Sequence, residues 1–317
     1  MNLSLTLLVP TWNRRKNLQA LLPLLRPELD RQPDLELIVS NNASPDDTAT
    51  YLNTLPPHPR LRVIHQPINY GATIHLAWLY GQARGRWLWL ICDDDLLAPD
   101  AVAFVCAALR AHPELGWIHL PHVYLLAEGG EFASRLPTQD EFLPRGRSAF
   151  VPYVSWITFA TSNVVRTDLL QRQLPHMRWD NEFWPTDLLL AAVAETPALI
   201  PARRFISAGA EVTWAERRVR VLHCDLTETI LSSRFLSRSE RAACLLQKYR
   251  DLPNQLGRLI VIKPTLLARA LWCQPRLLGV LLRPSELAKL FRPSVWANLA
   301  RRLFRGHKIV GGMFPKG

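Results

Sequence analysis

The sequence is poor in two features that mark whole classes of protein. Its five cysteines, Cys92, Cys106, Cys224, Cys244 and Cys273, form no C-x-x-C pair. An odd, scattered set fits reduced cytosolic thiols better than a disulfide framework. No uncharged apolar run reaches the length of about 18 residues that a transmembrane helix needs. The opening segment MNLSLTLLVP has no basic residue before its apolar run and no small-residue cleavage site, so we expect a buried first strand there and not a signal peptide.

Acidic residues are nearly absent from the end of the chain. Residues 258–317 contain twelve Lys and Arg but one acid, Glu286, so they hold the whole formal charge of +11, and residues 1–257 are neutral. The stretch 294–308 (SVWANLARRLFRGHK) places apolar residues near one helical face and basic residues elsewhere. This pattern is typical of a helix on an anionic membrane surface, although a packed helix with a solvated basic face is equally compatible with it. We therefore expect a domain at 1–257 and a basic amphipathic helical segment at 258–317.

Apolar runs alternate with helical patterns through the first hundred residues. The runs at 3–9, 35–40, 61–66 and 86–92 are typical of buried strands. The segments between them favour helices, and this alternation predicts an α/β fold with a mostly parallel sheet and crossover helices. Further along the chain we expect helices at 101–111 and 186–194, a strand within 115–126, a polar loop at 127–150 and a return to the sheet or its lid within 151–165.

Polar motifs follow each of the four predicted strands. In parallel sheets, ligands bind beyond the carboxyl ends of the strands, so motifs at these ends converge on one site. The motifs are Pro10–Arg14 (PTWNR), Asn41–Ser44 (NNAS), Asn69–Gly71 (NYG) and Asp93–Asp95 (DDD).

The three consecutive acids, Asp93, Asp94 and Asp95, come directly after the apolar run WLWLIC. Adjacent carboxylates at the end of a buried strand are costly unless a cation neutralises them. A hard divalent cation such as Mg²⁺ or Mn²⁺ does so and bridges to substrate phosphates. An isolated acid triplet is as readily a solvated turn that caps the next helix, but the three neighbouring motifs favour a metal and diphosphate site.

The other motifs suit a nucleotide. The segment that begins at Pro10 places backbone amides and Arg14 near an anion at a helix start, and Trp12 can border a nucleobase. The Asn42 amide can both donate to and accept from a base edge, and Gly71 permits close approach of the backbone. Taken alone, the first segment is better explained as an ordinary helix entry, whereas the asparagine pair is as readily an Asx turn.

The order PTWNR, VSNNAS followed by DDT, NYG and LICDDDLLAPD resembles family 2 glycosyltransferases with the GT-A fold. The resemblance is strong over the first third of the chain and looser over two-thirds. Asn41-Asn42-Ala43-Ser44 stands where the family usually has two aspartates, glycine and serine. This departure resembles the abequosyltransferase- and rhamnosyltransferase-like subgroup, which transfers deoxy- or dideoxy-sugars in bacterial surface polysaccharides such as O-antigen, and it leaves the base identity open.

The resemblance implies a nucleotide-sugar half at about 1–100 and an acceptor half at about 101–257. It implies Asp95 as the metal ligand for Mg²⁺ or Mn²⁺. It also implies that Asp187 is the general base of an inverting transfer, with Thr186 in place of the usual glutamate; Asp180 and Glu182 are rival bases, and His223 is a weaker candidate metal ligand. The residues that it assigns to the nucleotide-sugar are Pro10, Thr11, Asn13, Arg14, Asn42, Gly71, Asp93 and Asp94.

The implied partners are a UDP-, dTDP-, CDP- or GDP-sugar donor and a glycan or polyprenyl-diphosphate-linked acceptor. The basic segment suggests a peripheral position at the inner face of the cytoplasmic membrane, and no motif suggests nucleic acid. Two alternatives remain. A nucleotidyltransferase would need a glycine-rich phosphate loop after the first strand, which PTWNRR lacks. A non-enzymatic membrane or polyanion adaptor would leave the acid triplet unexplained.

Overall fold

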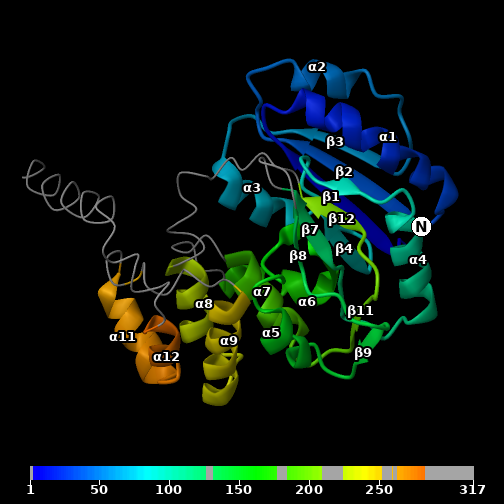
Figure 1. Cartoon of the computed structure of the whole chain (residues 1–317). Coiled ribbons are helices and arrows are strands. Elements are labelled where there is room, and N and C mark those ends of the chain that lie inside the picture. The colour runs from blue at the N-terminus through cyan, green and yellow to red at the C-terminus, as the bar shows by residue number, and fades with distance from the viewer. Residues whose placement is uncertain are drawn as a thin grey trace, which may run out of the picture. The chain divides into compact units, whose positions relative to one another are not determined.

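A computed structural model describes residues 3–125, 131–176, 184–208, 224–251, 259 and 263–282. The chain divides into two compact units, Met1–Thr213 and Trp214–Gly317, and each is described by itself. The first unit is a mixed α/β structure, and the described part of the second is helical (Figure 1). The expected domain boundary after residue 257 remains a prediction.

The first unit is built on an eight-stranded sheet with the order β3-β2-β1-β4-β10-β6-β11-β9. Strands β1 to β4 pair in parallel, as do β6 and β11, whereas β10 and β9 are antiparallel to their neighbours. The expected mostly parallel sheet is therefore confirmed. Its strands are β1 (Leu5–Thr11), β2 (Leu35–Asn41), β3 (Leu61–His65), β4 (Trp87–Leu90), β6 (Trp117–His119), β9 (Glu141–Leu143), β10 (Asn163–Arg166) and β11 (Ala198–Ile200).

A smaller sheet with the order β5-β12-β7-β8 lies in the same unit. Its strands are β5 (Leu96–Leu97), β7 (His122–Leu125), β8 (Glu131–Ala133) and β12 (Ile206–Ala208). The loop expected at 127–150 therefore contains strands and a helix in its described part. The helices of the unit are α1 (Arg15–Arg31), α2 (Thr48–Asn53), α3 (Gly71–Tyr80), α4 (Ala101–Ala111), α5 (Arg147–Tyr153), α6 (Thr167–Gln171) and α7 (Trp184–Val193), with 3-10 turns η1 (Ala160–Ser162) and η2 (Leu174–His176).

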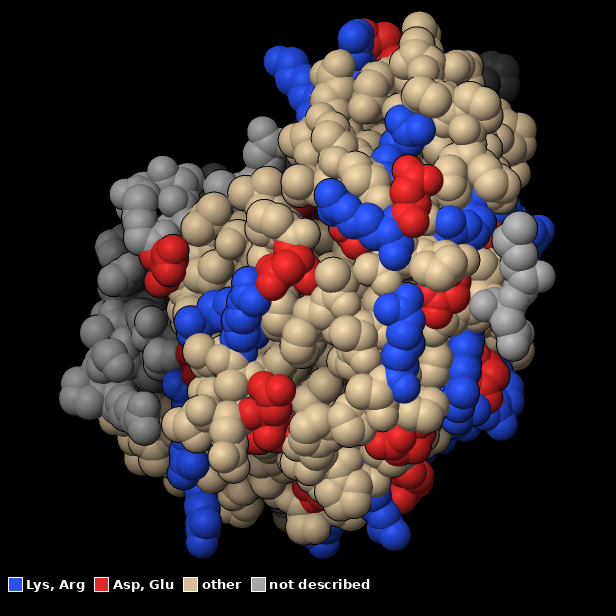
Figure 2. Space-filling model, turned by 90° about the vertical axis from the view of Figure 1, so that its right-hand side faces the viewer, with Lys and Arg blue, Asp and Glu red and all other residues tan. Residues whose placement is uncertain are grey.

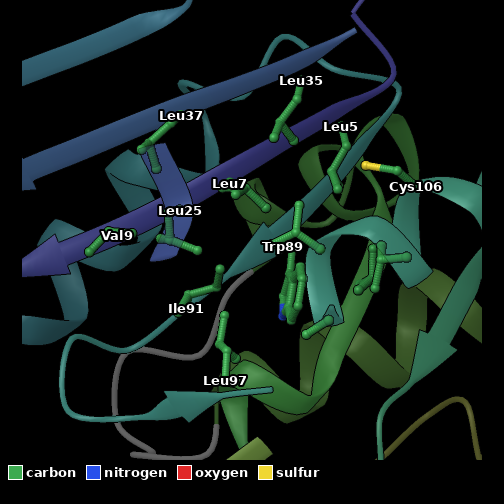
Figure 3. Packing of buried hydrophobic residues seen from close by; sticks show 14 of the residues in the cluster. Leu5, Leu7, Val9, Leu25, Leu35, Leu37, Trp89, Ile91, Leu97 and Cys106 are labelled. Carbon is green, nitrogen blue, oxygen red and sulfur yellow. The ribbon is translucent and has the colours of Figure 1, made fainter. Parts of the chain in front are cut away.

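Helices cover both faces of the large sheet. Successive side chains of a strand point to opposite faces. Leu7 and Trp89 belong to a buried cluster that includes residues of α1 and α4 (Figure 3), whereas Leu88 and Leu90 lie with side chains from α3, α6 and α7. Burial on both faces explains why the strands read as continuous apolar runs rather than alternating ones.

Helix α1 holds the first strand-end motif in place. Its buried leucines recur every three or four residues, which puts them on one face against the sheet. Each fully buried leucine contributes roughly 2 kcal/mol relative to an exposed one. The helix therefore begins at a fixed point directly after the PTWN segment. The leucines are Leu18, Leu21, Leu22, Leu25 and Leu29.

A buried tryptophan fixes the end of β4. The Trp89 indole N–H donates to the Thr161 carbonyl oxygen at 2.7 Å. Leaving a buried donor unpaired costs about 1–3 kcal/mol, so this bond tightly couples β4 to the turn η1. As a result Thr161, which is distant in sequence, lies at the end of β4.

Charged side chains of both signs are interspersed on the face shown in Figure 2. Ion pairs in the first unit include Arg166 with Asp168 at 2.9 Å and Arg203 with Asp100 at 2.6 Å. Such exposed pairs contribute little to stability. They agree with the near-neutral composition of residues 1–257.

The second unit contains α8 (Leu226–Ser232), α9 (Arg238–Asp251), α11 (Pro264–Cys273) and α12 (Leu277–Leu281) (Figure 1). Helices α8, α9 and α11 pack against one another. The predicted amphipathic helix at 294–308 lies outside the described residues. Over the part of the chain that the structure describes, no helix is long and apolar enough to span a membrane.

Candidate nucleotide and metal site

The acid triplet lies where β4 ends. The main chain folds back there, because the Asp95 N–H donates to the Cys92 carbonyl at 3.2 Å. Asp93 and Asp95 are buried, with 7% and 4% exposure, and the side chain of Asp94 is 21% exposed. The triplet is therefore not the solvated turn that remained possible from the sequence.

Arg14 joins the first strand-end motif to the triplet. Its Nη1 lies 2.9 Å from Asp93 Oδ1 and 2.6 Å from Asp94 Oδ2. The Thr11 hydroxyl donates to the second oxygen of Asp93 at 2.7 Å. The structure therefore brings together Thr11, Arg14, Asp93 and Asp94, as the convergence of strand ends predicted.

Burial and charge compete at Asp93. Burial raises the pKa of Asp93 to about 6, even though Arg14 and the Thr11 hydrogen bond favour its ionised form. For Arg14, burial alone would lower the pKa, but Asp93 and Asp94 outweigh it and raise the pKa above its ordinary value. Ionising Asp93 therefore costs free energy, because water is largely excluded from its surroundings.

Thr161 is a site residue that the sequence did not reveal. Its hydroxyl donates to Asp95 Oδ2, and its oxygen accepts from the Cys92 main-chain N–H at 3.0 Å. Thr161 lies 66 positions from Asp95, and only the antiparallel pairing of β10 with β4 brings them together. No local pattern in the sequence signals this contact.

The triplet offers a donor set for a divalent cation. One carboxylate oxygen from each of Asp94 and Asp95 and the Cys92 sulfur lie within 4.8 Å of one another. Burial, followed by the charge of Asp95, raises the pKa of Cys92 well above its usual value, so the thiol stays protonated. The two carboxylates are the hard oxygen ligands that Mg²⁺ and Mn²⁺ prefer. These residues fit such an ion, and the expected role of Asp95 remains a prediction.

The loops after β1 and β2 are joined by hydrogen bonds. The Asn42 main-chain N–H donates to the Thr11 carbonyl at 2.9 Å, and the Asn13 N–H donates to Ser44 Oγ at 2.8 Å. Asn13 and Ala43 both adopt left-handed backbone conformations, with φ of 58° and 55°. Such conformations are uncommon outside glycine, and they concentrate at sites where the surrounding structure imposes them.

The Asn42 side chain ties the third strand-end motif to the second. Its amide N–H donates to Asn69 Oδ1 at 2.9 Å, and its Oδ1 accepts from the Tyr70 N–H at 3.1 Å. Gly71 begins α3 with φ of 74°, where glycine is favoured. Asn42 thus positions a loop and still retains one N–H and one lone pair, so its contact with a base remains a prediction.

Asp187 lies in the first turn of α7, with Thr186 buried beside it. Pro185 and Thr186 line a small cavity of about 20 Å³ together with Ile157, Thr158 and Ala160. The start of α7 therefore packs against the chain that leads into Thr161. Its catalytic role remains a prediction, and Asp180, Glu182 and His223 lie outside the described residues.

Aromatic side chains approach the triplet from the smaller sheet. Burial, followed by the charge of Asp95, raises the pKa of Tyr124 strongly, so its hydroxyl stays protonated. The Tyr124 ring stacks on Phe132 at 6.3 Å and meets Phe159 edge-on at 5.4 Å. The sequence did not reveal that Tyr124 and Phe132 lie together, because they are brought side by side by the pairing of β7 with β8.

A mostly parallel sheet with buried carboxylates and linked polar loops at its strand ends is typical of α/β proteins that bind their ligands at this edge. Residues 6–143 match the family model described as Glycosyl transferase family 2. Over this segment, which is less than half of the chain, the sequence is similar to that family, in agreement with the order of the motifs.

Among curated relatives, the chain is 26% identical over 109 residues to abequosyltransferase RfbV of Salmonella typhimurium strain LT2. This match covers 34% of the chain and spans 33% of the relative.

Two solved structures show the same fold. TarS of S. aureus in complex with UDP-GlcNAc aligns with a TM-score of 0.60 at 13% identity, covering 86% of this chain and 89% of that one. The mannosyltransferase PcManGT of Pyrobaculum calidifontis, in complex with GDP-Man and Mn²⁺, aligns with a TM-score of 0.55 at 16% identity, covering 95% and 87%. The expected GT-A fold is confirmed by these neighbours.

Proposed function

We propose that the protein is a glycosyltransferase that moves a sugar from a nucleotide-sugar to a glycan or polyprenyl-diphosphate-linked acceptor in surface polysaccharide synthesis. The observation that carries the proposal is the Arg14 bridge to Asp93 and Asp94. It joins two strand-end motifs inside the segment that matches the family model. The similarity to abequosyltransferase RfbV supports a surface polysaccharide as the product.

In this proposal the donor nucleotide lies across the ends of β1, β2 and β4. Trp12, which is 47% exposed, borders the base, and the remaining hydrogen-bonding capacity of Asn42 faces the base edge. Asp93 contacts the ribose and diphosphate region, where Arg14 keeps it ionised. The relatives' complexes with UDP-GlcNAc and GDP-Man support a nucleotide-sugar donor without fixing its base.

Asp94 and Asp95 would hold Mg²⁺ or Mn²⁺, with Asp95 as the direct ligand. A bound divalent cation supplies charge neutralisation for the diphosphate that leaves. Thr161 orients the Asp95 carboxylate by its hydrogen bond, and Arg14 limits the negative charge next to the phosphates. The Mn²⁺ in the PcManGT complex supports this choice of ion.

The reaction is a single displacement with inversion. The acceptor hydroxyl oxygen bonds to the anomeric carbon while the bond from that carbon to the phosphate oxygen breaks, and the nucleoside diphosphate leaves with the electron pair. Asp187 takes the hydroxyl proton as the new bond forms. Its place in the first turn of α7 favours the ionised carboxylate, because the N-terminus of a helix carries partial positive charge.

The base assignment is tested with Asp187→Asn in the full-length protein. Asp187→Asn should lower sugar transfer about 100-fold or more, because general-base catalysis contributes roughly that factor. Donor affinity should be unchanged, as measured by calorimetry. The matched control is Glu195→Gln, a 58% exposed acid just beyond the other end of α7, which should transfer normally. Full transfer activity of Asp187→Asn would contradict the assignment of Asp187 as the general base.

A further inference from the structure

An open groove of about 510 Å³ lies within the second unit. It is formed by side chains of α8, α9 and α11, which pack against one another. A volume of this size suits a lipid headgroup or a small ligand. The groove is lined by Leu231, Arg238, Arg241, Arg269, Trp272 and Cys273.

The arginines of the groove differ in how far their charge is neutralised. Arg269 donates to both oxygens of Glu228 at 2.8 and 3.1 Å, so its charge is balanced. Arg241 contacts main-chain carbonyls at 3.3 and 3.4 Å, which leave its charge in place. Arg238, one helical turn away on α9, is exposed. The groove therefore carries two positive charges suited to a phosphate, which guanidinium groups bind with two parallel hydrogen bonds.

One large apolar side chain of the groove is strongly exposed. Trp272 is 81% exposed, more than any other large apolar side chain of the described residues. Helix α12, which packs against α9 and α11, also has two exposed leucines, Leu278 and Leu282, at 50% and 57%. Exposed tryptophan beside cationic groups is characteristic of protein surfaces at a membrane interface.

We propose that this groove binds the phosphate headgroup of an anionic phospholipid, with Trp272 inserted at the bilayer surface. Arg238 and Arg241 contact the phosphate, and Glu228 holds Arg269 at the groove wall. A soluble phosphate would satisfy the arginines but would leave Trp272 in water, so the combination favours a lipid in a bilayer. The proposal is independent of the sugar-transfer site, since all of its residues belong to the second unit.

The test measures binding of the full-length protein to vesicles by co-sedimentation. One set of vesicles contains phosphatidylcholine alone, and the other contains equal parts of phosphatidylcholine and phosphatidylglycerol. Each arginine near an anionic surface contributes about fivefold in affinity, so Arg238→Ala/Arg241→Ala should weaken binding to the anionic vesicles about 25-fold. Trp272→Ala should weaken it at least about fivefold, and Trp272→Phe should restore part of the loss.

Arg250→Ala is the matched control. Arg250 is an exposed arginine of the same helix, nine positions from Arg241 and therefore on the opposite face of α9. Its substitution should leave vesicle binding nearly unchanged. A loss of about fivefold for the control, the same as for each arginine of the groove, would mean that net charge alone drives binding, and that result would overturn the proposal.

Photoactivatable phosphatidylglycerol gives a second measurement, which locates the bound lipid on the protein. Label in wild-type protein should map to peptides of α9 and α11, and the arginine double variant should lose it while keeping its melting temperature. Label found solely in other peptides, or label unchanged in the double variant, would contradict the proposal. Transfer to a soluble acceptor should be normal in all these variants, which separates this test from that of the proposed function.

Discussion

The ionised Asp93 makes the ligand-free protein less stable, and Asp93→Asn should reveal this. Asp93 is buried, and burial raises the pKa of its carboxyl from 3.8 to about 6. A carboxyl whose folded pKa lies above its unfolded value takes up protons on folding. Its favourable contribution to the free energy of unfolding is therefore present at low pH and is lost as the pH rises from about 3.8 through about 6.

The magnitude follows from the size of the shift. A shift of roughly two pKa units corresponds to about 3 kcal/mol between acidic and neutral pH. Asparagine removes this cost but weakens the bond from Arg14 by about 1 kcal/mol. We expect Asp93→Asn to be more stable than wild type by about 2 kcal/mol at pH 8, which raises the melting temperature by roughly 4 °C.

The assay is thermal unfolding with EDTA and without nucleotide, at pH 4.5 and pH 8. The gain should appear at pH 8 and vanish at pH 4.5, where wild-type Asp93 is itself protonated. The same variant should lose nucleotide-sugar affinity, because a neutral amide replaces an ionised group of the site. A variant less stable than wild type at pH 8, or a gain of the same size at both pH values, would refute the reasoning.

Three further predictions concern the elements that support the site. Thr161→Val removes the hydroxyl that binds Asp95 Oδ2, so metal-dependent transfer should fall about 10- to 100-fold in steady-state assays, whereas Thr161→Ser should retain most of it. The His122 ring is fully buried, and burial lowers its pKa to about 3, so its stabilising contribution is complete above pH 6.5 and is lost as the pH falls. Phenylalanine cannot be protonated, so the stability of His122→Phe relative to wild type should increase by about 2 kcal/mol between pH 7.5 and pH 5, as measured by urea unfolding. Leu22→Ala, at a fully buried position of α1, should cost about 3 to 4 kcal/mol in the same unfolding assay, while Leu24→Ala at a 40% exposed position should cost well under half of that.

The sequence predicted the first part of the fold, from β1 to β4, because its signals are local. Strands β1 to β4 appear as apolar runs, and each is followed within a few residues by one of the polar motifs. Parallel pairing then brings Arg14 and Asp93 together without any further information. The special backbone role of Gly71 could also be predicted, since its positive φ suits glycine.

The parts that the sequence did not reveal depend on distant pairing. Thr161 contacts Asp95 because β10 pairs antiparallel with β4, and no pattern of apolar residues in the sequence predicts that pairing. Tyr124 reaches the triplet from the smaller sheet, whose strands are two to four residues long and leave almost no pattern. The engagement of Asn42 with Asn69 was also unexpected, because both looked like independent turn residues.

The most direct test of the central claim is the affinity for a nucleotide-sugar measured by calorimetry with Mn²⁺ and with EDTA. The ligand is the best binder from a panel of UDP-, dTDP-, GDP- and CDP-sugars, and the proteins are wild type, Asp95→Asn and Asp30→Asn, the last at an 81% exposed acid. Wild type and Asp30→Asn should bind at least about tenfold more tightly with Mn²⁺, and Asp95→Asn should lose that difference. Equal affinity of wild type in Mn²⁺ and EDTA, or an undiminished Mn²⁺ effect in Asp95→Asn, would contradict the account.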